Sequence, residues 1–168
     1  MPTMPDFSWL AVSPPLVLLL TAGIGLLTAV FTNDNRLTAG LSLIGVVTAG
    51  IMNLVIFQNS LSGVETSGFG LSYFADLPAA AFGFVIILGT ALAILVAFDY
   101  LQRTGIDHPE YYPLMLLSAA GAMVMAAAGD LIILLLGLEI MSLAVYVLSA
   151  WRQGQRESEE AGMKYFLL

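Results

Sequence analysis

The stretch that decides the fold runs from Gly129 to Lys164 and reads GDLIILLLGLEIMSLAVYVLSAWRQGQRESEEAGMK. Its first part, residues 131–150, is a long apolar run with one carboxylate, Glu139, near the middle. A membrane-spanning helix needs about 20 mostly apolar residues, which is the length of this run. A second helix is predicted to begin near Ser158, a suitable N-cap residue, and to carry Lys164 in its second turn. The stretch therefore predicts two neighbouring membrane helices with an ionisable group on each.

Other apolar runs of similar length precede this stretch. They predict an all-α fold, a polytopic transmembrane helix bundle with five full spans and the start of a sixth. Ser13 is expected to cap the first span, with Pro14 and Pro15 in its first turn, where a missing N–H costs little. The segment 58–76 is expected to be a polar loop. The expected spans are Pro14–Phe31, Leu37–Phe57, Pro78–Phe98, Tyr111–Ala128 and Leu131–Ala150, with the sixth starting near Ser158.

Only Gly129 and Asp130 separate the fourth and fifth runs. Glycine can take the left-handed position after one helix, and aspartate can cap the next. Two residues would then be enough to reverse the chain. The sequence predicts a tight antiparallel hairpin here.

The composition is that of a membrane protein. Hydrophobic residues make up 59% and charged residues 10% of the 168 residues, whereas soluble domains have about 25% charged residues. The chain has no cysteine and one histidine, His108, which excludes disulfides, iron–sulfur clusters held by thiolates, and a haem with two histidine axial ligands from this chain. A net charge of −7 also argues against nucleic acid as a partner.

The arginines predict the orientation. They follow the first, third and fifth spans, whereas residues 58–76 and the pair 129–130 carry none. The positive-inside rule then places the arginine loops in the cytoplasm and the N-terminus outside. Asp99 and Arg103 are spaced to form an ion pair at the end of the third span.

Glu139 is the strongest candidate for chemistry. It is the ninth of the 20 residues in 131–150, close to the bilayer midplane, where an acidic side chain costs about 2.5–3.5 kcal/mol on insertion scales. Ser142, Tyr146 and Ser149 fall on the same side of the helix and predict a water-bridged path toward the cytoplasm. The alternatives are a protonated Glu139 that makes one interhelical hydrogen bond, and hydroxyls that bond only to neighbouring helices or the backbone.

Lys164 is the only lysine and the second candidate for proton translocation. A titratable amine placed inside a helix suits proton transfer because burial changes its affinity for protons readily. The alternative is that it extends to the nearby interface as an ordinary snorkelling lysine. Its depth is expected to differ from that of Glu139 by roughly 8 Å, so a water bridge is favoured over a direct ion pair.

Three segments carry a resemblance to a known family. They are Glu110-Tyr-Tyr through the hairpin, GLEIMSLAVYVLSAW around Glu139, and SEEAGMKYFLL around Lys164. Together they resemble the subunit N family of the proton-pumping NADH–quinone oxidoreductase, respiratory complex I, which is antiporter-like. In that family a Glu in a Gly-Leu-Glu context and a Lys before Tyr-Phe-Leu-Leu take part in proton translocation.

The resemblance implies how the chain is organised and where it works. Residues 1–109 would hold three leading helices, and residues 110–168 the start of the antiporter-like repeat, with helices four, five and part of six. The chain would be a multi-pass protein of the bacterial inner membrane that carries part of a proton pathway and is expected to be a fragment or a truncated subunit. It would hold no cofactor itself, while the whole complex uses NAD and quinone.

Two other functions fit the same residues. Helices one to three carry no ionisable residue in their interiors, which suits a scaffold that anchors neighbouring membrane subunits. A cation/proton antiporter subunit of the Mrp type is the other alternative. Other membrane subunits and the lipid bilayer are the expected partners in each case.

Overall fold

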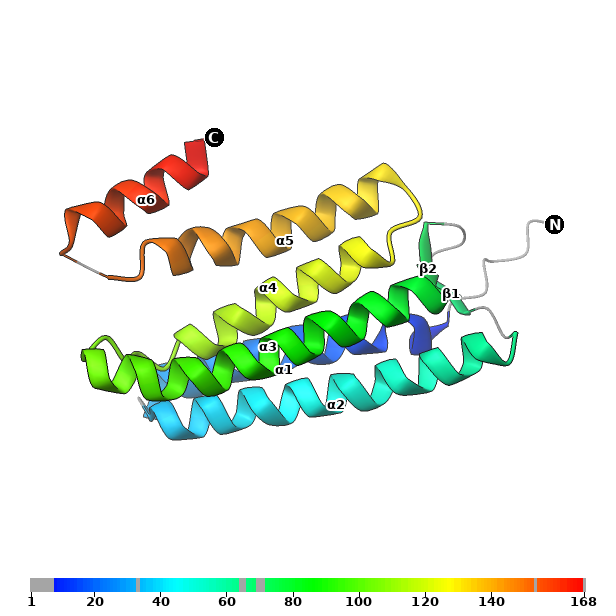
Figure 1. Ribbon diagram of the computed structural model, residues 1–168, viewed down its shortest axis with the longest axis horizontal. Helices are drawn as coiled ribbons and strands as arrows, with labels where there is room; N and C mark the ends of the chain where they lie inside the picture. The colour runs from blue at the N-terminus through cyan, green and yellow to red at the C-terminus, as the bar shows by residue number, and fades with distance from the viewer. Residues whose placement is uncertain (1–7, 33, 64–65, 69–71, 153, 168) are drawn as a thin grey trace.

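The computed structural model describes residues 8–32, 34–63, 66–68, 72–152 and 154–167. The regular elements within these ranges are helices and one small β-hairpin, joined by short connections (Figure 1). The elements are α1 (Trp9–Thr32), α2 (Asn35–Leu61), β1 (Thr66–Gly68), β2 (Tyr73–Ala75), α3 (Leu77–Thr104), α4 (Tyr111–Ala126), α5 (Leu131–Ser149) and α6 (Arg156–Leu167).

Helices α1 to α4 form a bundle in which α1 and α3 each pack against both α2 and α4. Its core is a cluster of fully buried side chains from all four helices, among them Leu18, Val46, Ile94 and Tyr112. Helix α5 packs on α4, and α6 packs on α5, so these two lie outside the bundle (Figure 1). The residues predicted to carry chemistry are therefore on the outermost layers of this chain.

Four of the described helices, α1, α2, α3 and α5, are long and apolar enough to cross a membrane. Helix α4 is apolar too but has 16 residues, about 24 Å against a hydrocarbon core of about 30 Å. It ends at Ala126, two residues before the predicted end. The predicted all-α bundle is thus confirmed, with four helices that could span a membrane, while a fifth full span stays a prediction.

Helix α1 begins at Trp9, and Pro14 and Pro15 lie inside it. The prediction that Ser13 caps this helix is therefore wrong. Pro14 has no N–H to offer the carbonyl of Leu10 four residues earlier. The Ser13 hydroxyl donates to that carbonyl at 2.8 Å instead, so the helix continues through the prolines without leaving the group unpaired in an apolar environment.

The connection between α4 and α5 is longer than predicted, with four residues from Ala127 to Asp130. Asp130 caps α5 as expected, since its carboxylate accepts a hydrogen bond from the Ile133 N–H at 2.8 Å. Gly129 does not take the left-handed conformation predicted for it. Its N–H donates to the Ser72 carbonyl at 2.8 Å. A neighbouring segment therefore holds this turn in place.

That neighbouring segment is the β-hairpin, which the sequence predicted only as a polar loop. Strands β1 and β2 pair antiparallel, with Ser67 opposite Phe74. The Phe74 N–H donates to the Ala127 carbonyl at 2.8 Å. Tyr73 is buried against the same connection, and this burial raises the pKa of its phenol. The hairpin thus docks on the connection between α4 and α5.

The arginine-bearing segments gather at one end of the molecule. The end of α1, the start of α2, the end of α3, the start of α4, the end of α5 and the start of α6 all lie on the left of Figure 1. Asp99 and Arg103 form the predicted ion pair there, with 2.9 Å between Oδ2 and Nε. The side of the membrane that this end faces stays a prediction.

Candidate functional site

Glu139 lies on the outer face of α5, the ninth of its 19 residues. Its side chain is exposed, and neighbours such as Leu135 and Leu143, 56% and 57% exposed, are apolar. Among the described residues, none forms a hydrogen bond or ion pair with the Glu139 carboxyl group. The structure therefore presents a carboxyl group in the middle of an apolar surface.

The packing of α5 explains why Glu139 faces outward. Helix α5 meets α4 at Gly137, where an added Cβ would lie 2.9 Å from the Gly121 carbonyl oxygen. Glu139 is two residues further along, about 200° around the helix. Contact through Gly137 thus turns Glu139 away from the bundle.

Sequence reasoning did not identify the Gly121–Gly137 contact. A Cβ on Gly121 would lie 2.4 Å from the Met141 nitrogen and 2.6 Å from the Gly137 carbonyl oxygen. Backbone therefore packs directly on backbone at this point. The signal was available as a glycine in each of two adjacent apolar runs, since small residues allow membrane helices to approach closely.

The hydroxyl groups near Glu139 do not reach its carboxyl group. Ser142 is buried and donates to the Glu139 backbone carbonyl at 3.2 Å, and Ser149 donates to the Val145 carbonyl at 2.8 Å. For these serines the structure shows the alternative, bonding back to the helix. A water-bridged path through Ser142, Tyr146 and Ser149 stays a prediction.

Lys164 is on α6 and pairs within its own helix. Its amine lies 3.5 Å from Glu160, with the lysine side chain 73% exposed, and Glu160 also pairs with Arg156 at 3.1 Å. The structure therefore brings Lys164 together with Glu160 and not with Glu139. The ring of the next residue, Tyr165, packs against Tyr146, about 10 Å along α5 from Glu139.

Helix α6 begins at Arg156, two residues before the predicted start. Ser158 therefore lies inside the first turn, and the prediction that it caps this helix is wrong. Its hydroxyl donates to the Ser149 carbonyl at 3.2 Å and accepts from the Arg152 N–H at 3.2 Å. Ser158 thus ties the start of α6 to the end of α5.

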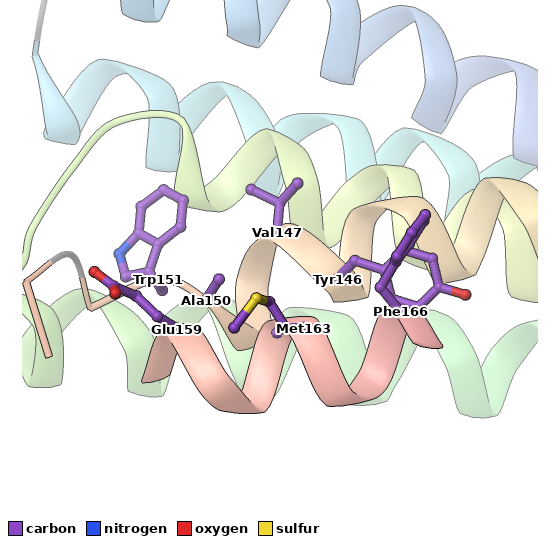
Figure 2. A pocket seen from close by; sticks show the side chains of 8 residues that line it. Tyr146, Val147, Ala150, Trp151, Glu159, Met163 and Phe166 are labelled. Atoms are coloured by element: carbon purple, nitrogen blue, oxygen red, sulfur yellow. The ribbon is translucent and has the colours of Figure 1, made fainter. Parts of the chain in front are cut away.

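A cavity of about 550 Å³ lies between the second half of α5 and α6 (Figure 2). Tyr146 and Phe166 stand at one end, and Trp151 and Glu159 at the other. Glu159 accepts a hydrogen bond from the Gly154 N–H at 3.3 Å. Apart from Glu159 and Tyr146 the lining is mainly apolar, so the cavity offers a space beside the predicted path.

Both ends of α5 are fixed, which makes the helix a rigid support for Glu139. At its start, the Ile133 N–H and Ser72 hydrogen-bond the Asp130 carboxylate and hold its pKa below the usual range. Just beyond its end, the Trp151 indole N–H donates to the Ile106 carbonyl at 3.1 Å. No cluster of three or more potential metal ligands occurs in the described part of the chain.

The cap at Asp130 gives a pH-dependent prediction. Folding lowers the pKa of this carboxyl group. The cap therefore stabilises the protein fully above the pKa of aspartate in the unfolded chain, about 3.9, and this stabilisation is lost as the pH falls through the lower pKa of the folded protein. Asp130→Ala should lower the apparent unfolding temperature in detergent at pH 7 by about 2–4 °C. The difference between variant and wild type should shrink below about pH 4. A difference that is the same at pH 3 and pH 7 would contradict this.

Comparison with known proteins gives matches over nearly the whole chain. Residues 128–168 match the family model described as NADH:quinone oxidoreductase/Mrp antiporter, TM. NADH-quinone oxidoreductase subunit N 1 of Herpetosiphon aurantiacus is 32% identical over 164 residues, which is 98% of this chain and 32% of the relative. Subunit N of Trichlorobacter lovleyi is 39% identical over 157 residues, 92% of this chain and 31% of the relative. The chain thus spans about a third of the length of these relatives.

Proposed function

Because this chain is homologous to NADH-quinone oxidoreductase subunit N along nearly its whole length, we propose that it is a membrane part of a proton-translocating NADH–quinone oxidoreductase. Glu139 is the group in this chain that takes up and releases the proton. The complex resides in the bacterial inner membrane, with the N-terminus of this chain outside and α4 completing a fifth span.

The observation that carries this proposal is the position of Glu139. An acidic group at mid-span is costly unless it has a partner, a water-filled cavity or a function. The described residues supply no ion-pair partner for it, and its side chain points away from the bundle. Its partner therefore comes from outside these residues, as expected for a subunit that completes its site in a larger assembly.

The chemistry at Glu139 is the gain and loss of one proton. An apolar environment penalises the ionised carboxylate, and a cation brought close to it stabilises that form. When such a cation approaches, the carboxyl group releases its proton. When the cation withdraws, the carboxylate binds another.

The energy for this cycle comes from other subunits. Moving one charge against 100 mV costs about 2.3 kcal/mol. In the proposal, the oxidation of NADH by quinone takes place outside this chain and drives the motion of the cation. This chain supplies the carboxyl group and the rigid helix that holds it.

Lys164 has a smaller proposed role, since its amine is exposed and is paired with Glu160. Lys164→Met should lower the number of protons translocated per NADH only in part, through loss of a cation near the cytoplasmic end of the path. Arg156→Met is the matched control, because Arg156 pairs with the same carboxylate from the preceding turn. Equal effects of the two variants would show that Lys164 contributes only as a surface charge.

The proposed function is tested by purification of the full-length protein with an affinity tag. It should copurify with NADH–quinone reductase activity, and the reconstituted assembly should move protons when NADH is added, without a requirement for sodium. Sodium-dependent proton exchange in the absence of NADH would instead indicate an antiporter subunit. Copurification with neither activity would overturn the proposal.

A further inference from the structure

A groove of about 240 Å³ runs between the first half of α2 and the second half of α3, which lie side by side at the lower edge of Figure 1. Its walls are apolar and include Leu43, Leu95 and Phe98. It is hollowed at Gly40, where an added Cβ would meet nothing within 4 Å. The groove therefore has room for a slender apolar group.

A cation stands at one end of this groove. Arg36 lines it from the first turn of α2 and is exposed. Asp34 accepts a hydrogen bond from the backbone N–H of Arg36 at 2.9 Å, but the Arg36 guanidinium has no ion pair with any residue that the structure describes. By contrast, Arg103 pairs with Asp99 on the neighbouring helix end. Arg36 is thus available to an anion from outside the chain.

Arg36 and the apolar walls of the groove lie at depths that match the headgroup layer and the acyl-chain layer of a bilayer. Helix α2 has 27 residues, about 40 Å, and exceeds a hydrocarbon core of about 30 Å. Its first turn therefore extends into the headgroup layer. Leu43, seven residues further on, lies about 10 Å deeper, among the acyl chains.

We propose that this groove binds one anionic phospholipid, with its headgroup on Arg36 and an acyl chain along the groove wall. The charge decides between possible occupants. An apolar helix of another protein would fill the groove but would leave the guanidinium unpaired. A zwitterionic lipid would add a second cation beside Arg36, whereas an anionic lipid supplies the missing negative charge.

The test uses the full-length protein in its membrane assembly, placed in nanodiscs of phosphatidylcholine. Phosphatidylglycerol with a photoactivatable group on one acyl chain is added as the probe, and labelled peptides are identified by mass spectrometry. Labelling should be found on residues 39–43 and 94–98. Arg36→Gln should lower it about fivefold, as expected for the loss of one basic side chain near anionic headgroups.

Three further variants serve as controls. Arg103→Gln should leave the labelling unchanged, because Arg103 is already paired with Asp99. Arg36→Lys keeps the charge and should retain most of the labelling. Gly40→Leu should lower it by filling the groove, and its Cβ can be added without a clash, since nothing lies within 4 Å of that position. Equal labelling by a phosphatidylcholine probe, full labelling of Arg36→Gln, or no labelling of these peptides in wild type would each overturn the proposal.

Discussion

Replacement of Gly121 by valine is expected to prevent α4 and α5 from packing and to abolish assembly of the full-length protein. The Cβ at this position would lie 2.4 Å from the Met141 nitrogen and 2.6 Å from the Gly137 carbonyl oxygen. Both atoms belong to the backbone of α5, so no side chain can rotate away. The helices would have to separate, and we expect a cost at the upper end of the usual overpacking range, about 3 kcal/mol or more.

The measurement is the yield of assembled complex after mild detergent extraction, followed by size-exclusion chromatography. Gly89→Val is the matched control, since Gly89 lies in the interior of a membrane helix, α3, where an added Cβ meets nothing within 4 Å. The control should assemble as wild type does. Normal assembly of Gly121→Val would show that α4 and α5 do not need this close contact.

Helices α1 to α5 could be predicted because each contains a long apolar run that ends in polar residues. Asp130 could be predicted as a cap because it lies directly before an apolar run, and the structure confirms it. The start of α1 could not, because it depends on the Ser13 hydroxyl taking over a carbonyl that Pro14 leaves free. Helix-start rules describe proline in a first turn but not this compensation inside a helix.

Which residues of each helix face the core and which face the lipid could not be predicted with the same success. In a membrane protein, the lipid-facing and core-facing residues are both apolar, so hydrophobic periodicity does not separate them. The buried position of Gly137 and the outward position of Glu139 follow from the close contact with Gly121. Likewise, the docking of Tyr73 depends on contacts between segments far apart in the sequence.

The candidate site is only partly determined by this chain. Glu139 was placed correctly in the middle of a helix, but its interaction partner does not lie among the described residues. Lys164 finds a local partner in Glu160, which the spacing of four residues on one helix permits. Sequence spacing alone did not distinguish this local pair from a longer connection to Glu139.

The second large effect is expected for Glu139→Gln. Glutamine keeps the size and hydrogen-bonding capacity of the side chain, but it can neither release a proton nor respond to an approaching cation. Proton translocation should therefore fall to the background of the membrane, while the amount of assembled complex stays normal. Glu139→Asp keeps the titratable group on a shorter side chain and should retain part of the activity.

The central claim is tested most directly by the number of protons translocated per NADH oxidised in vesicles that contain the complex. Glu157→Gln is the matched control, because Glu157 is an exposed glutamate in the first turn of α6. The account predicts a ratio near zero for Glu139→Gln and a wild-type ratio for Glu157→Gln, at equal complex content. A wild-type ratio for Glu139→Gln would contradict the account and leave Glu139 a structural residue.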